Sequence, residues 1–138
     1  GLRIMGLGGC IRYNREDTYQ YTEKEMRRRA RKLWFKAHRA GGIDLLLTHA
    51  PAKGLNDGDD KAHKGFETFN GLLEDYQPKW FVHGHVHLNY DAKLPRVCTH
   101  GRTTVINATE RYLFEIPDPD PTAQRKFFWK NPAFTTEN

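Results

Sequence analysis

Three histidines follow two apolar segments of the chain, and their positions make them candidate metal ligands. His49 ends the run LLLTH, whereas His85 and His87 lie in GHVH, directly after the run KWFVH. Such apolar runs are typical of buried strands, and in α/β sheets the binding groups collect where the strands end. Neutral imidazole is a good ligand for zinc, manganese, iron or nickel. We therefore predict that His49, His85 and His87 bind metal at the carboxyl edge of a sheet.

The remaining histidines carry weaker signals. A single histidine near a strand is usually structural, and this is our interpretation of His38 and His100. His83 would point to the same side as His85 in a regular strand. We expect His83 to support the ligands or the fold, rather than to bind metal itself.

The segments around the candidate ligands predict an α/β fold with a mixed sheet. Apolar runs predict strands at Leu2 to Leu7, Ile43 to Thr48 and Trp80 to His83, and apolar spacing predicts helices at Thr22 to Ala40 and Phe66 to Tyr76. Thr22 and Glu25 form a capping box at the start of the first helix. Strands alternating with helices, followed by a run of strands, are typical of a layered α/β domain.

The last part of the chain predicts a hairpin and then a tail. Thr103 to Asn107 and Tyr112 to Ile116 have the composition of two paired strands, whereas Leu88 to Arg102 is polar and predicted to be loop, with a poor strand as the alternative. The tail, residues 117–138, begins with PDPDP and then carries aromatic residues. Proline excludes helix and central strand at its start.

The positive charge of the chain is concentrated in the first predicted helix. The net charge is +5, but residues 22–40 hold eight Lys or Arg against two Glu, so the rest of the chain is slightly acidic. A solvated outer face explains such a helix most simply. The alternative is that the helix binds nucleic acid or another anionic partner.

Two of these motifs resemble those of a known family. THAP at 48–51 and GHVH at 84–87 are similar to the last two signature blocks of calcineurin-like metallophosphoesterases, and GLGG at 6–9 is similar to the segment before them. The resemblance covers residues 1–116. It implies the C-terminal half of a layered α-β-β-α sandwich, with a mixed sheet and flanking helices. It also implies that His49 and His85 bind one metal and His87 the other, in a centre of two Mn, Fe, Zn or Ni ions that hydrolyses phosphate mono- or diesters.

The chain departs from the family in lacking its earlier, acidic blocks. No D-x-H, G-D-x-x-D or G-N-H block is present, and Gly58-Asp59-Asp60 has Ala62 where an acidic residue is needed. A bridging carboxylate normally offsets the repulsion between two metals about 4 Å apart. We expect the catalytic acid that protonates the leaving group to lie in a missing N-terminal part. The chain alone is then inactive and binds one metal weakly or none.

A polar loop between the two histidine blocks is the predicted substrate side of the site. Long polar loops in compact domains are often functional, and Gly54 to Gly65 would lie near the metals. We predict that His63, Lys64 and Asn89 contact the phosphate ester. A solvated connection without a role in binding is the alternative for this loop.

Composition narrows the remaining possibilities. No apolar stretch is long enough to cross a membrane, and Cys10 and Cys98 form neither a disulfide pattern nor a zinc pattern, which favours the cytoplasm. The start at Gly1 favours a piece of a longer protein. Exposed sheet edges then predict self-association. Besides a phosphoesterase, two hypotheses stay open: a nucleic-acid-binding module using helix 22–40, and a non-catalytic metal-binding domain.

Overall fold

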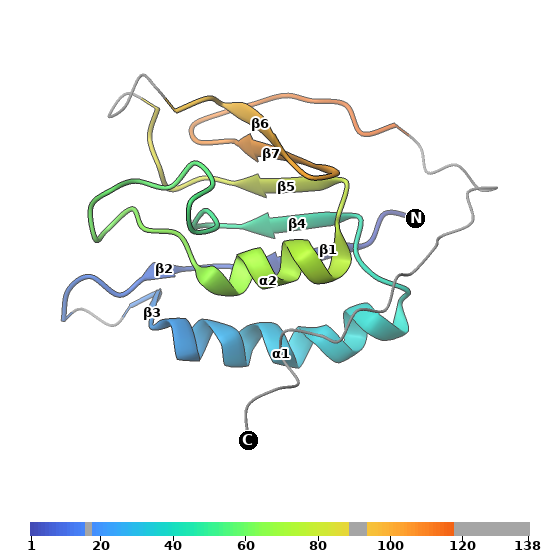
Figure 1. Cartoon of the computed structure of the whole chain (residues 1–138), viewed down its shortest axis with the longest axis horizontal. Helices are drawn as coiled ribbons and strands as arrows, with labels where there is room; N and C mark the ends of the chain where they lie inside the picture. The colour runs from blue at the N-terminus through green and yellow to red at the C-terminus, as the bar shows by residue number, and fades with distance from the viewer. Residues whose placement is uncertain (16–17, 89–93, 118–138) are drawn as a thin grey trace.

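The computed structural model describes residues 1–15, 18–88 and 94–117. Its elements alternate as predicted around the two histidine blocks (Figure 1). They are β1 (Ile4–Leu7), β2 (Cys10–Ile11), β3 (Gln20–Tyr21), α1 (Glu23–Arg39), β4 (Leu45–Thr48), α2 (Glu67–Tyr76), β5 (Trp80–His83), β6 (Val97–His100) and β7 (Thr103–Asn107). The tail from residue 118 onward lies outside the described residues.

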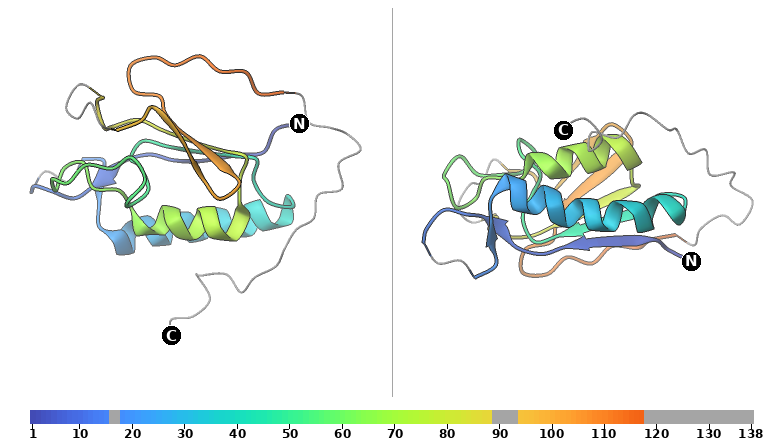
Figure 2. Two further views of the ribbon diagram at one scale, coloured as in Figure 1. Left: turned by 45° about the horizontal axis from the view of Figure 1, so that its top comes forward. Right: turned by 90° about the horizontal axis from the view of Figure 1, so that it is seen from below.

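The main sheet has five strands in the order β1-β4-β5-β7-β6. Neighbours from β1 to β7 are parallel, and β6 is antiparallel to β7. Both helices lie on one face of this sheet (Figure 2). The predicted α/β fold with a mixed sheet is therefore confirmed. Because β4, β5 and β7 are parallel neighbours, their carboxyl ends meet at one edge of the sheet.

The core lies between the sheet and the two helices. Leu46 of β4 and Phe81 of β5 are fully buried, and they belong to one apolar cluster with Met26 of α1 and Phe69 of α2. The capping box predicted for α1 is present, with Glu25 N–H bonded to Thr22 and the Glu25 carboxylate bonded back to the Thr22 N–H. Burial of this face fixes which side of each strand points away from the helices.

Glu23 joins the two helices at the carboxyl edge of the sheet. Its carboxylate accepts hydrogen bonds from the backbone N–H groups of Glu67 and Thr68, at 3.1 and 2.6 Å. The N-cap residue of α2, Phe66, has no side chain that could do this. A carboxylate from α1 thus satisfies the free donors at the start of α2.

The opposite face of the sheet is covered only in part. Leu45, Val82 and Ile106 are buried there beneath other apolar side chains, among them Phe114 and Ile116. Ile4 and Leu47, in contrast, are 57% and 47% exposed.

The predicted hairpin is wrong in one of its strands. Thr103–Asn107 pairs with Val97–His100, which lies in the segment where we expected loop or at most a poor strand, and residues 112–116 form no strand. The strand at 97–100 was missed because its side chains are largely exposed, so it carries no apolar signal. The apolar residues at 112–116 contribute by covering the sheet rather than by extending it. The short strands β2 and β3 were not predicted either.

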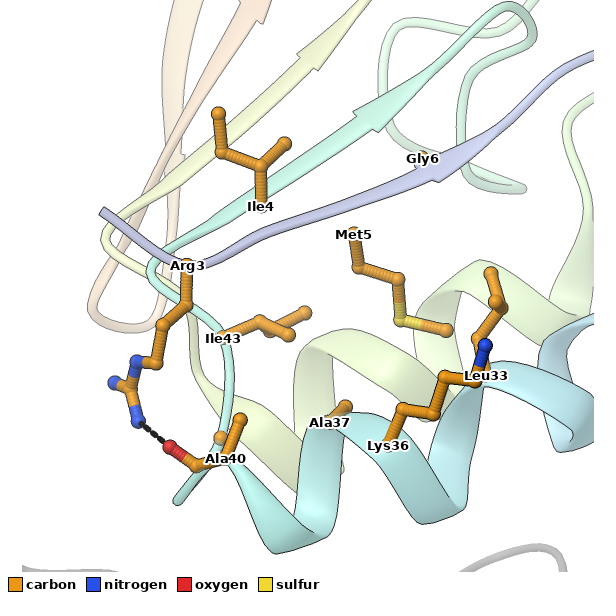
Figure 3. A pocket seen from close by; sticks show the side chains of 10 residues that line it. Arg3, Ile4, Met5, Gly6, Leu33, Lys36, Ala37, Ala40 and Ile43 are labelled. Carbon is orange, nitrogen blue, oxygen red and sulfur yellow. Dashed lines mark hydrogen bonds between the residues drawn. The ribbon is translucent and has the colours of Figure 1, made fainter. Parts of the chain in front are cut away.

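A cavity of about 390 Å³ lies at the free edge of the sheet, between β1 and the C-terminal half of α1. Met5, Ile43 and Ala37 line its interior, while Arg3 closes one end by bonding to the carbonyl oxygen of Ala40 (Figure 3). Arg3 also forms an ion pair with Asp44 at 2.8 Å. None of the candidate ligands lines this cavity.

Among the described residues, no helix is both long and apolar enough to cross a membrane.

Candidate metal centre

Strand register places the two histidine blocks side by side. Leu47 of β4 is paired with Val82 of β5, and the ladder continues one step beyond the strands, where the Gly84 N–H donates to the His49 carbonyl at 3.0 Å. His49 therefore lies next to Gly84, and the residue after Gly84 is His85. Two segments far apart in the sequence are joined here by backbone bonds, so their separation is set by the sheet.

His85 occupies a strained turn that directs its ring toward His49. Its φ is +67°, and the Val86 N–H bonds to the Gly84 carbonyl at 2.8 Å, which closes a three-residue γ-turn. A γ-turn with positive φ at its centre is rare and strained. Strain of this kind occurs mostly at functional sites, where the surrounding structure holds it in place.

The two rings meet through nitrogen atoms. His49 Nε2 lies 3.0 Å from His85 Nδ1, and the other nitrogen of His85, Nε2, lies 2.7 Å from the carbonyl oxygen of Ala62. If Nε2 donates to this carbonyl, Nδ1 carries the lone pair. A backbone carbonyl that fixes the tautomer in this way is the usual partner of a metal-binding histidine.

The spacing of these nitrogens fits two ligands of one ion. Imidazole nitrogens bound about 2.0–2.1 Å from a metal, at cis or tetrahedral angles, lie about 2.9–3.4 Å apart. The observed 3.0 Å falls in this range, and a hydrogen bond between the rings explains it equally well when no metal is present. The distance between these two nitrogens is therefore compatible with a shared ion.

Asn107 and Thr109 hold the turn from the neighbouring strand. Both donate to the carbonyl oxygen of Val86, from Asn107 Nδ2 at 2.8 Å and from Thr109 Oγ1 at 3.0 Å. Asn107 Oδ1 in turn accepts from the Thr109 N–H. Neither residue was among the site residues predicted from the sequence. The available signal was an N-A-T sequence at the end of a third strand, beside the two that carry histidines.

The loop between the histidine blocks folds back onto the site. Its ends are tied together by hydrogen bonds between Phe66 and both Pro51 and Lys53. Gly65 fits closely here, because a Cβ at this position would lie 2.3 Å from the carbonyl carbon of Ala52. As predicted for this loop, it lies at the candidate site, where it supplies the Ala62 carbonyl that contacts His85.

His63 is a loop side chain that lies close to the candidate ligands. Its ring centroid lies 5.3 Å from that of His85, and its Nδ1 lies 2.8 Å from the Asp60 carboxylate. This contact also lowers the pKa of Asp60. A histidine oriented by a carboxylate is a common arrangement for binding anions or moving a proton.

Burial favours the neutral form of the central histidines. It lowers the pKa of His49 and of His85, and the charges of His49, His63 and His87 lower that of His85 further. His83 is 1% exposed, and burial lowers its pKa to about 4. Its Nδ1 contacts the Gly84 carbonyl, while its Nε2 has no hydrogen-bond partner within the described chain. Neutral imidazole is the form that binds metal.

No family model, curated protein or solved structure matches this chain. The structure brings the rings of His49, His63 and His85 together. His87 is exposed, and its link to this cluster is that it lowers the pKa of His85. In the described ranges, no hydrogen bond or ion pair links Lys64 to these rings, and Asn89 lies outside those ranges. As placed, no three His, Cys, Asp or Glu side chains of the described residues converge on one point.

Proposed function

We propose that this chain carries the histidine side of a metal-dependent phosphoesterase centre of the calcineurin-like kind. The observation that supports this most is the His49–His85 pair, with nitrogens 3.0 Å apart at the carboxyl ends of two parallel strands. Two independent backbone contacts hold the pair, from Gly84 to His49 and from His85 to Ala62. Both histidines belong to the motifs that resemble the family.

The chemistry that divalent ions supply in such a centre is polarisation of a phosphoryl oxygen and activation of a water molecule. His49 and His85 would hold one ion through Nε2 and Nδ1, and His87 would contribute to a second. His63, on the loop beside them, is placed to contact a phosphate oxygen. Because its ring is paired with Asp60, it can donate from Nε2 while Nδ1 keeps its partner.

The fold is compatible with half of an α-β-β-α sandwich. Helices cover one face of the sheet, while the other face leaves the apolar side chains of Ile4 and Leu47 exposed. A second sheet would bury these side chains. The acidic ligands and the residue that protonates the leaving group would come with that second half.

A non-catalytic metal-binding domain is the second candidate. It is favoured by one observation: two carboxylates of the loop beside the rings have other partners, since Asp60 contacts His63 and Asp57 accepts from the Gly65 N–H. Neither is placed to bridge two ions. Such a domain would bind metal through His49 and His85 without any hydrolytic activity.

Hydrolysis assays separate the two candidates. With p-nitrophenyl phosphate or its diester and added Mn²⁺, we expect no turnover by residues 1–138 alone, and turnover by a longer protein that also contains the acidic blocks. In that longer protein, His85→Ala should abolish activity, whereas the matched variant His100→Ala should leave it unchanged. Robust turnover by the isolated chain would contradict the proposal that the acidic ligands of the site lie outside residues 1–138. A longer protein that binds metal but never hydrolyses either ester would favour the second candidate.

A further inference from the structure

The outer face of α1 carries a row of exposed cations. We name this row the basic stripe; its members, all exposed, are Lys24, Arg28, Arg31, Lys32, Lys36 and Arg39. At 100° per residue they span about 140° of the helix circumference, centred opposite the buried Met26, Ala30 and Ala37. The helix is about 25 Å long, so the stripe presents a cation at nearly every turn over that length.

The stripe differs from the other cations of the same helix. Arg29 is turned inward, where its guanidinium lies 4.1 Å from the centre of the Tyr21 ring and bonds to the Gly8 carbonyl. The two acidic residues of α1 are also engaged, Glu23 at the start of α2 and Glu25 in the capping box. Within the described residues, no ion pair neutralises a member of the basic stripe. Within the part of the chain that the structure describes, its positive potential is therefore uncompensated.

An exposed aromatic side chain interrupts the stripe. Phe35 is 67% exposed and lies between Arg31 and Arg39, one turn from each. Its ring meets Trp34 edge-on at 5.0 Å, and Trp34 stacks on His38 at 5.3 Å. A single exposed aromatic ring among cations is normal on a surface that only contacts water. It is, however, the combination that binds single-stranded nucleic acid, with cations on the phosphates and aromatic rings against the bases.

We propose that the basic stripe, together with Phe35, binds single-stranded nucleic acid along the outer face of α1. The phosphates would lie against the cations, and at least one base would stack on Phe35. An anionic membrane is a weaker match, because a helix that enters a membrane surface needs a free apolar face. The apolar face of α1 is buried against the sheet, which leaves Phe35 as the large apolar side chain on the outside.

This binding is separate from the proposed metal chemistry. The basic stripe uses no residue of the histidine cluster, so it should act with or without metal and in a His85→Ala variant. If both proposals hold, a nucleic acid on α1 would be brought next to the carboxyl edge of the sheet, since α1 begins there at the contact between Glu23 and α2. Failure of either proposal would leave the other standing.

Fluorescence anisotropy with a labelled 15-nucleotide oligo(dT) or oligo(U), in EDTA, tests the proposal. Affinity should fall steeply between about 50 and 200 mM NaCl, since each phosphate contact adds about 0.7 to the logarithmic slope for single strands. The triple variant Arg28→Gln, Arg31→Gln, Lys32→Gln should bind at least about tenfold more weakly, with a smaller slope. Phe35→Ala should also bind about tenfold more weakly, but with the slope unchanged, because stacking releases no counterions.

A charge-matched control removes three exposed cations elsewhere, as Lys79→Gln, Arg102→Gln and Arg111→Gln. This variant should bind as the unmodified chain does, and circular dichroism should show that all variants are folded. Absence of binding at 50 mM NaCl, or equal losses in both triple variants, would overturn the proposal. Binding to phosphatidylserine vesicles without binding to either oligonucleotide would overturn it as well, in favour of a membrane surface.

Discussion

Asn107 donates a hydrogen bond from Nδ2 to the carbonyl oxygen of Val86, at 2.8 Å, and so ties β7 to the turn that carries His85. Asn107→Ala removes this donor and also the acceptor of the buried Thr109 N–H. We expect the free energy of unfolding to fall by about 1–3 kcal/mol. Any metal bound through His85 should be held about 10–100-fold more weakly, as is usual when an outer-shell partner is lost.

Denaturant unfolding and metal titration measure these two effects. Thr109→Val is the comparison, because it removes one donor to Val86 and leaves Asn107 in place. It should weaken both properties less than Asn107→Ala does. An Asn107→Ala variant that matches the unmodified chain in stability and metal affinity would show that the turn is held without Asn107.

Burial of His83 predicts a loss of stability in acid. Its pKa is about 4 in the folded chain, against about 6.5 when unfolded. Below about pH 6.5 His83 takes up a proton in the unfolded state but not in the folded state. Its contribution to the free energy of unfolding is therefore fully present above that pH and declines toward pH 4. The decline attributable to His83 is up to about 3 kcal/mol. The lowered pKa values of His49 and His85 act in the same direction.

Urea unfolding of the metal-free chain between pH 4 and 7.5 measures this decline. His83→Gln should flatten it, because the group that titrates has been removed. His100→Gln, at an exposed position of β6, should leave it in place. A decline of the same size in His83→Gln would assign the effect to other groups.

Close packing at Gly65 makes it intolerant of any side chain. A Cβ there would meet the backbone of Ala52, which cannot move aside as a flexible side chain does. Gly65→Ala should lower the free energy of unfolding by about 1–3 kcal/mol. Gly8→Ala is the matched control, since nothing lies within 4 Å of its Cβ position. Thermal unfolding of the two variants should separate them clearly, and equal melting temperatures would contradict the tight fit.

The contact between α1 and α2 depends on one carboxylate. Glu23→Ala leaves the backbone N–H groups of Glu67 and Thr68 without their acceptor. We expect a loss of about 1–2 kcal/mol, as for removal of a helix N-cap. Lys24→Ala changes the next residue, which is exposed, and should be nearly neutral. Chemical denaturation compares them; a neutral Glu23→Ala would mean that water replaces the carboxylate.

Self-association of the chain is a further prediction. Among the described residues β1 has a partner strand on one side only, and Ile4, its first residue, is exposed on the face that the helices leave open. Such an edge is prone to pair with another copy. Sedimentation velocity should show concentration-dependent association, and Ile4→Lys should reduce it. A chain that sediments as a monomer at all concentrations, with or without the substitution, would rule this prediction out.

The parts of the fold that could be predicted from the sequence are those with a periodic pattern of apolar residues or a helix-capping motif. Examples are α1, with its Thr22 and Glu25 capping box, and the buried strands β4 and β5, with the histidines at their ends. Prediction from the sequence failed at β6, because exposed strands have no apolar pattern and are defined by their partner. Asn107 could not be assigned a role from the sequence either. Its function depends on the register of β7 against β5, a long-range pairing that no local pattern encodes.

The central claim is that His49 and His85 hold one metal ion together. Titration of the chain with Co²⁺ at pH 7.5, followed by visible absorption, tests it most directly, because bound Co²⁺ absorbs according to its ligands. We predict weak binding of one ion that is lost in His49→Ala and in His85→Ala. The double variant His38→Ala, His100→Ala should retain it. Binding that is identical in all these variants, or an unmodified chain that binds no Co²⁺ at millimolar concentration, would contradict the claim.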